Sequence, residues 1–204
     1  MKKRIIALGL LWCLSAVMLQ AARVDTVLVR SAAMNKDVKV VYVLPDKAIG
    51  KQACPVVYLL HGYGGNARSW VQLKPELPQM ADEKGIIFVC PDGKNSWYWD
   101  SPENPAYRYE TFVTSELVKY TDGNYATIPD RKARAISGLS MGGHGALWSA
   151  IRHKDVFGAA GSMSGGVDIR PFPQNWEMHK QLGEFAANKA SWDAHTVVNQ
   201  LDKI

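Results

Sequence analysis

Hydrophobic positions in the first ninety residues follow two different strand patterns. Across Val24–Val29 and Val38–Val43, apolar and polar side chains alternate, which predicts two antiparallel strands joined by a turn. The later segments Val56–Leu60 and Ile86–Cys90 are instead continuously apolar. Strands that are buried on both faces of a parallel sheet have this second pattern. The chain is therefore expected to combine an antiparallel pair with a parallel sheet.

The second half of the chain alternates predicted helices and strands. Glu110–Tyr120 has apolar residues at helical spacing, and Ala133–Ser137 and Phe157–Ser162 are strand candidates. Beyond Gly165, where the pattern weakens, Trp176–Phe185 and Ala190–Leu201 suggest helices. Alternating strands and helices predict an α/β protein, a three-layer α/β/α sandwich with a mostly parallel central sheet. Ligands then bind beyond the carboxyl ends of the strands.

A Gly-x-Ser-x-Gly motif follows the predicted strand 133–137. Composition alone would produce this motif ~0.1 times in a chain of this length, so the context matters. Ser140 stands at the centre of residues 138–142, and an apolar stripe at helical spacing follows it: Ala146, Leu147, Ala150 and Ile151. A strand, a sharp turn and a helix around such a serine predict a nucleophile elbow. Gly138 and Gly142 are expected because larger side chains would collide across the turn.

A second glycine-rich motif supports an acyl-transfer site. His61-Gly62-Tyr63-Gly64-Gly65-Asn66 follows the apolar strand that ends at Leu60. In α/β-hydrolases, one oxyanion donor is the residue after the nucleophile, and the other comes from the loop after the third strand. These positions predict the N–H groups of Met141 and Tyr63 as the oxyanion hole.

The same loop also fits a dinucleotide-binding fingerprint. Residues 62–67 match Gly-x-Gly-x-x-Ala, and Asp82 lies at the ~20-residue offset of the ribose-binding acid. That acid should end a second strand, whereas Asp82 lies within a polar segment. Pro75 and Pro78 also interrupt the helix that should follow the loop. The hydrolase interpretation is therefore preferred.

Together these motifs resemble the esterase D-like family. It includes S-formylglutathione hydrolases, feruloyl, acetyl-xylan and tributyrin esterases, and mycolyltransferases. The resemblance covers roughly residues 24–200 and also includes residues 91–93, Pro-Asp-Gly. It implies an α/β-hydrolase fold without a cofactor, with Ser140 as the nucleophile and His144 as a structural histidine.

One departure from the family pattern concerns the rest of the catalytic triad. The family continues into a strand that ends in the catalytic Asp, and then into a Gly-His-x-Trp-like segment with the catalytic His. Neither segment has a match here, so both residues are expected beyond residue 204, and the chain is interpreted as a C-terminally truncated esterase with little turnover of its own. Five residues are weaker local candidates for these roles: His61, His153, Asp168, His179 and His195.

The expected function is that of a secreted serine carboxylesterase acting on short acyl or hydroxycinnamoyl esters, including carbohydrate-linked ones. Trp97 and Trp99 follow the Pro-Asp-Gly turn on the ligand side of the sheet, where they could stack on sugar or phenolic rings. A packed loop is an equally good interpretation of these side chains. Ser162 and Ser164 are expected at a strand end that lines the pocket. An acyltransferase on the same scaffold and a non-catalytic carbohydrate-binding protein are the alternatives.

Residues 1–22 resemble a secretory signal peptide, which leaves residues 23–204 as one esterase domain. A basic start, Lys2-Lys3-Arg4, precedes an apolar stretch that is too short for a comfortable membrane span. These three residues supply most of the formal net charge of +5, so the basic balance gives no case for nucleic acid. A secreted or periplasmic location follows, with no membrane attachment after cleavage.

Cys54 and Cys90 remain after cleavage of this segment. They are expected at opposite ends of two neighbouring parallel strands, roughly 20 Å apart, which is too far for a disulfide. His-Glu-x-x-His and Cys-x-x-Cys motifs are both absent from the sequence, and no metal site is predicted.

Overall fold

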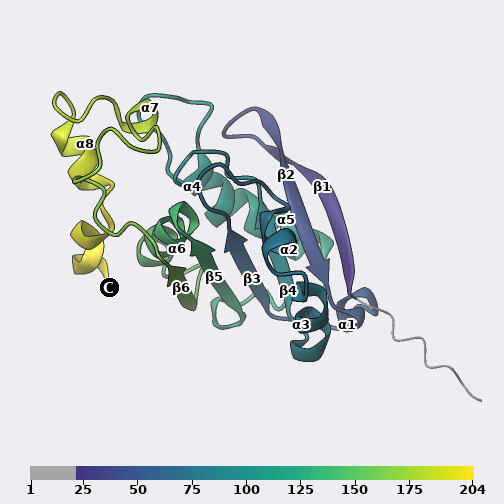
Figure 1. The fold of residues 1–204 in the computed structure, drawn as a ribbon. Helices are drawn as coiled ribbons and strands as arrows, with labels where there is room; N and C mark the ends of the chain where they lie inside the picture. The colour runs from purple at the N-terminus through teal and green to yellow at the C-terminus, as the bar shows by residue number, and fades with distance from the viewer. Residues whose placement is uncertain (1–21) are drawn as a thin grey trace, which may run out of the picture.

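A six-stranded sheet forms the centre of the protein in a computed structural model that describes residues 22–204 (Figure 1). The strand order is β1-β2-β4-β3-β5-β6. The strands are β1 (Arg23–Ser31), β2 (Lys36–Leu44), β3 (Val56–Leu60), β4 (Ile87–Pro91), β5 (Arg134–Leu139) and β6 (Ala159–Met163). The predicted signal peptide lies outside the described residues except for Ala22.

The direction of the strands agrees with the hydrophobic patterns. β2 runs antiparallel to β1 and β4, whereas β3 runs parallel to β4 and β5, and β5 parallel to β6. Every residue of β4 and most of β3 are buried, as expected for strands covered on both faces. In the described part of the chain, β6 forms one edge of the sheet, and its side chains are largely exposed.

Helices cover both faces of the sheet and produce the predicted three layers. One face packs against α2 (Ser69–Leu73) and α3 (Leu77–Lys84) through a core that includes Trp70, Leu77 and Phe88. The other face packs against α5 (Leu117–Asn124) and α6 (Met141–Arg152) through a larger aromatic core. The short helix α1 (Asp46–Ile49) follows β2, and a 3₁₀ turn (Arg131–Ala133) precedes β5.

Two predicted helical regions differ in detail from the structure. The helix expected at 110–120 is built from α4 (Tyr109–Thr111), a π-helical turn (Phe112–Glu116) and α5. The long helices expected after Gly165 are replaced by α7 (His179–Leu182), α8 (Lys189–Ala194) and a 3₁₀ segment (Val197–Lys203). This last part of the chain lies beside α6, on the opposite side of the molecule from β1 (Figure 1). Every helix within residues 22–204 is too short or too polar to span a bilayer.

The positions of Cys54 and Cys90 follow from two neighbouring parallel strands. Cys54 lies just before β3, and Cys90 lies near the end of the adjacent strand β4. Both thiols are buried and free. The prediction that they do not form a disulfide is therefore confirmed.

Candidate active site

Ser140 lies where β5 turns directly into α6. Its backbone has φ 55° and ψ −117°, a strained conformation of the kind that clusters at functional sites. The Ser140 N–H donates to the Met163 carbonyl over 2.8 Å, and the Ser140 carbonyl accepts from the His144 N–H over 3.0 Å. The residue itself is exposed. The turn thus has the geometry of a nucleophile elbow and leaves the serine accessible.

The loop after β3 comes close to this serine. A side-chain carbon added to Gly62 would lie 3.5 Å from Cβ of Ser140. The neighbouring Tyr63 N–H makes no hydrogen bond within residues 22–204. Met141 is the first residue of α6, where a backbone N–H has no acceptor inside the helix. Both predicted oxyanion donors therefore lie in segments that adjoin Ser140.

Ser140 opens into a small cavity of about 170 Å³. Its lining is mainly apolar and aromatic, and comprises Tyr63, Trp97, Ser140, Ser164, Gly166, Asp168, Ile169, Phe172, Trp176 and Met178. The ring centroids of Trp97 and Trp176 lie 6.1 Å apart, and those of Phe172 and Trp176 lie 5.6 Å apart. The cavity can therefore receive a planar or short apolar acyl group next to the serine.

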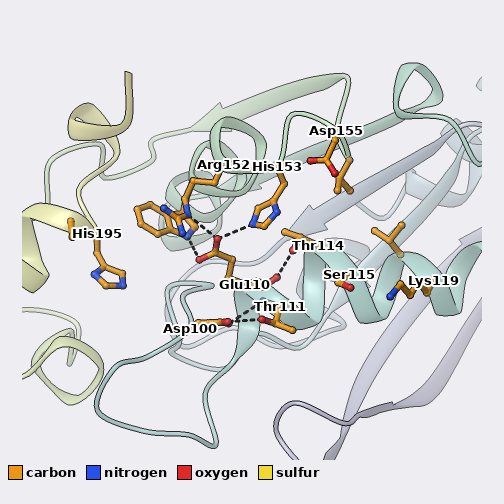
Figure 2. Close-up of a pocket in the computed structure, with 14 residues that line it drawn as sticks. Asp100, Glu110, Thr111, Thr114, Ser115, Lys119, Arg152, His153, Asp155 and His195 are labelled. Atoms are coloured by element: carbon orange, nitrogen blue, oxygen red, sulfur yellow. Dashed lines mark hydrogen bonds and ion pairs between the residues drawn. The ribbon is translucent and has the colours of Figure 1, made fainter. Parts of the chain in front are cut away.

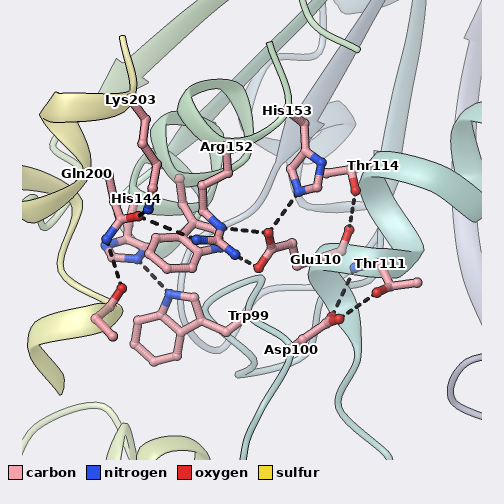
Figure 3. Close-up of polar contacts among 12 residues, drawn as sticks. Trp99, Asp100, Glu110, Thr111, Thr114, His144, Arg152, His153, Gln200 and Lys203 are labelled. Atoms are coloured by element: carbon pink, nitrogen blue, oxygen red, sulfur yellow. Dashed lines mark hydrogen bonds and ion pairs between the residues drawn. The ribbon is translucent and has the colours of Figure 1, made fainter. Parts of the chain in front are cut away.

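The two tryptophans expected to bind substrate occupy different places. Trp97 lines the Ser140 cavity. Trp99 is fully buried behind it and donates its indole N–H to Nε2 of His144 over 2.8 Å (Figure 3). Its ring stacks on Trp97 at a centroid distance of 5.5 Å. Direct substrate contact by Trp99 is therefore corrected to a supporting position, because the indole is covered and its polar atom is already used.

Comparison with known proteins identifies the family. Residues 31–204 match the family described as "Putative esterase". The chain belongs to this family. It is 28% identical over 135 residues to an acetyl esterase of Caldicellulosiruptor saccharolyticus, a match that covers 62% of this chain and 50% of the relative.

Other relatives of this esterase-family chain include enzymes named for different acyl chemistry. The diacylglycerol acyltransferase/mycolyltransferase Ag85A of Mycobacterium gordonae is 34% identical over 155 residues, covering 71% of this chain and 43% of the relative. A solved ferulic acid esterase superposes with a TM-score of 0.71 at 28% identity, covering 90% of this chain and 74% of that structure. The chain spans about half the length of the first two relatives. Its structural neighbours also include a serine hydrolase and an S-formylglutathione hydrolase, which share its α/β-hydrolase fold.

Two of the five histidines of this esterase-family chain hold loops around the site. His61 donates from Nδ1 to the Gly62 carbonyl over 2.7 Å and accepts at Nε2 from the Gly93 N–H over 2.9 Å. His144 donates from Nδ1 to the Gly166 carbonyl over 2.7 Å and accepts from Trp99 at Nε2. Burial lowers the pKa of His144 to about 4, so its ring is neutral near pH 7 and has a structural role, as the family resemblance implied.

The other histidines lie away from the nucleophile. His153 bonds Glu110 over 2.8 Å, and His195 donates from Nδ1 to the Ser191 carbonyl over 2.7 Å. His179 begins α7. Within residues 22–204, no histidine lines the Ser140 cavity, so none of them is brought together with the serine as a base.

Asp168 does line the Ser140 cavity, but its carboxylate already forms an ion pair with Arg170. Arg170 donates to both of its oxygens, from Nε and from Nη2, each over 2.8 Å. Arg170 also reaches Asp193 of α8 over 3.0 Å. The structure therefore gives Asp168 an ion pair rather than a histidine partner.

A larger cavity lies elsewhere in the described residues. It has a volume of about 800 Å³ between the π-helical turn, the end of α6 and α8 (Figure 2). Glu110 lies at its base and accepts hydrogen bonds from the Trp148 indole, the Arg152 guanidinium and the His153 ring, each over 2.8 Å (Figures 2 and 3). Ser140 does not line this cavity. The charges of Glu110 and Arg152 are paired with each other. We therefore interpret this cluster of Glu110, Trp148, Arg152 and His153 as structural and call it the Glu110 clamp.

This clamp predicts a pH-dependent contribution to stability. Burial alone would raise the pKa of Glu110, but the hydrogen bonds from His153, Arg152 and Trp148 outweigh it and lower the pKa to about 2. A glutamate whose pKa falls on folding stabilises the protein above its unfolded value near 4.5, and loses that effect as the pH drops towards 2. The expected contribution is about 3 kcal/mol at neutral pH.

The measurement is the free energy of unfolding of wild type and Glu110→Gln in urea at several pH values. The difference between the two proteins should be largest above pH 5 and should shrink as the pH falls towards 2. A difference that stays constant across this range would contradict the proposed charge-dependent clamp.

Several residues around Ser140 were not predicted from the sequence. Phe172 and Trp176 come from the weakly patterned segment after Gly165, and Asn95 and Glu177 contact the loop that carries Tyr63. The only available signal was that Asn95 follows the Pro-Asp-Gly turn on the ligand side of the sheet. Of the two serines expected to line the pocket, Ser164 does so and Ser162 does not.

Proposed function

We propose that this protein is a secreted serine carboxylesterase that hydrolyses short acyl or hydroxycinnamoyl esters through an acyl-enzyme on Ser140. The observation that supports it most directly is the convergence of an exposed Ser140 with two available N–H groups, those of Met141 and Tyr63. Membership of the esterase family supports the same chemistry. Secretion rests on the pattern of residues 1–22, which lie almost entirely outside the described part of the chain.

In the proposed reaction, Oγ of Ser140 attacks the ester carbonyl carbon while a base takes its proton. The carbonyl π electrons move to oxygen, and the resulting oxyanion accepts hydrogen bonds from the Met141 and Tyr63 N–H groups. Collapse of this intermediate breaks the bond to the alcohol oxygen, which takes the proton from the base. Water then attacks the acyl-serine in the same way and releases the carboxylic acid.

The cavity next to Ser140 supports the proposed acyl specificity. Trp97, Phe172 and Trp176 surround a space of about 170 Å³, and aromatic rings pack favourably on other planar rings. The similarity to a ferulic acid esterase agrees with this choice. Initial rates with acetyl, butyryl and feruloyl esters of one alcohol would test it. A preference for long aliphatic chains would contradict it.

We further propose that the catalytic Asp and His come from chain outside these 204 residues. In support, both ring nitrogens of His61 and His144 are hydrogen-bonded, and no histidine within residues 22–204 lines the Ser140 cavity. A serine hydroxyl without a base is a poor nucleophile. The 204-residue chain should therefore hydrolyse p-nitrophenyl acetate slowly.

Added imidazole should rescue this reaction. A base that is free in solution can replace part of the 10²–10⁴-fold effect of a positioned one, so the Ser140-dependent rate should rise about tenfold at saturating imidazole. Ser140→Ala measured under the same conditions subtracts hydrolysis by imidazole alone. Fast hydrolysis without imidazole that disappears in Ser140→Ala would show that the described residues already contain a base.

An acyltransferase is the second candidate, and the similarity to the mycolyltransferase Ag85A favours it. A sugar hydroxyl would then replace water in the second step. Product analysis with and without a sugar acceptor separates the two functions: transfer yields a new ester, whereas hydrolysis yields only the free acid. The absence of any covalent acyl-Ser140 would instead favour a non-catalytic binding protein.

A further inference from the structure

A chain of polar contacts connects the oxyanion loop to the segment after β6. The Gly64 N–H, next to the predicted donor Tyr63, donates to Oδ1 of Asn95 over 2.9 Å. The amide nitrogen of Asn95 in turn donates to Oε2 of Glu177 over 3.4 Å, across 82 positions of sequence. The Asn95 side chain thus bridges a loop after β3 and a residue just before α7.

Glu177 makes further contacts that hold it at this place. Its carboxylate also forms an ion pair with Lys180, three positions along the chain. Trp176 and Glu177 both have left-handed backbones, with φ values of 51° and 54°. For residues with side chains this conformation is costly, so surrounding contacts must maintain it.

The bridge also lies between two cavities. On one side is the aromatic cavity of Ser140, which Tyr63 and Trp176 line. On the other side is a polar cavity of about 330 Å³, and Gly64, Asn95 and Glu177 are in its wall. The loop that carries Tyr63 therefore borders open space on both sides.

We propose that Asn95 and Glu177 are positioning residues that hold the Tyr63 N–H in the oxyanion hole. This inference rests on the proposed function of Ser140. An oxyanion donor is effective only when it is aimed in advance at the position where charge develops, and an error of about 1 Å can cost 10²-fold in rate. The bridge supplies that alignment by fixing the next peptide, at Gly64, to the rest of the pocket.

Substitutions that exchange the hydrogen-bond donor and acceptor between positions 95 and 177 test this role. Asn95→Asp places two carboxylates against each other and should lower kcat about tenfold while KM changes less than about twofold. Glu177→Gln alone should have a small effect, because its amide oxygen still accepts from Asn95. The double variant Asn95→Asp/Glu177→Gln restores a donor and an acceptor, and should return kcat to within about threefold of wild type.

Asn104→Asp is the matched control, since Asn104 also accepts a backbone N–H, that of Ala106, but lies outside the bridge. It should leave kcat unchanged. All rates are taken for the Ser140-dependent reaction of p-nitrophenyl acetate with imidazole present. An Asn95→Asp variant with normal kcat, or a double variant with no recovery, would overturn the positioning role.

Hydrogen exchange of the Gly64 amide tests the bridge without any turnover. Glu177→Ala should accelerate this exchange about tenfold, although Glu177 does not contact the Gly64 N–H, because Asn95 loses its anchor. Unchanged exchange would overturn the proposal even if the enzyme is active. If wild type shows no Ser140-dependent turnover, the proposed function fails, and the exchange rate still decides whether the bridge restrains the loop.

Discussion

Replacing Ser140 by alanine should abolish covalent labelling by a fluorophosphonate and remove the imidazole-stimulated part of ester hydrolysis. In a serine hydrolase with a complete triad this removal costs at least about 10³-fold in rate, whereas here the expected loss is the roughly tenfold stimulation by imidazole. Intact-mass analysis after labelling measures the effect directly. Ser164→Ala is the matched control, because Ser164 lines the same cavity and also has a left-handed backbone, with φ 52°. It should label at the wild-type rate.

Ser140→Gly should have a second effect that alanine does not produce. The φ of 55° and ψ of −117° at this position strain any residue with a side chain, by of order 1–3 kcal/mol. Glycine adopts this conformation readily, so Ser140→Gly should be inactive but more stable than Ser140→Ala by about 1 kcal/mol. Thermal unfolding of the two variants provides the comparison.

Two results would contradict this account of Ser140. Equal stability of the glycine and alanine variants would mean that the turn stores no strain. Persistent labelling of Ser140→Ala, with the adduct located on Ser164, would move the nucleophile to the end of β6.

Local patterns were sufficient to predict the parts of the fold that determine the reaction type. The continuous apolar runs of β3 and β4 require burial on both faces, and the glycines around Ser140 are required by a turn of five residues. Each of these signals lies within a short stretch of sequence. The alternation of strands and helices then indicates a mostly parallel sheet, and the structure confirms it.

The rest of the site depends on contacts between distant segments. Trp99 was expected either to contact substrate or to pack within its loop, because it follows the Pro-Asp-Gly turn. The residue that decides between the two, His144, lies 45 positions away. Glu177 reaches Asn95 across 82 positions. After Gly165 the helices have four to seven residues. Helices this short are stabilised by tertiary contacts rather than by their own propensity, so periodicity did not predict their bounds.

Gly142→Ala should destabilise the protein by about 4 kcal/mol or more, the range reached only by severe substitutions. In an ordinary helix this change is favourable by nearly 1 kcal/mol. At Gly142, however, the added carbon would lie 2.1 Å from the Leu60 carbonyl oxygen and 2.7 Å from that of His61. Both atoms belong to the backbone where β3 enters the oxyanion loop, so relief requires β3 and α6 to separate.

Gly123→Ala provides the matched control, because Gly123 also lies in a helix, α5, and a carbon added there would meet nothing within 4 Å. It should stabilise the protein by about 0.5–1 kcal/mol. Urea unfolding of the two variants therefore compares the same chemical change at two positions, where opposite effects on the free energy of unfolding are expected. If both shift stability in the same direction, α6 does not pack on the end of β3 as closely as the elbow requires. If Gly142→Ala destabilises the protein and Gly123→Ala stabilises it, glycine is required at position 142 for the close contact that brings the oxyanion loop to Ser140. Flexibility of the helix would not be the reason.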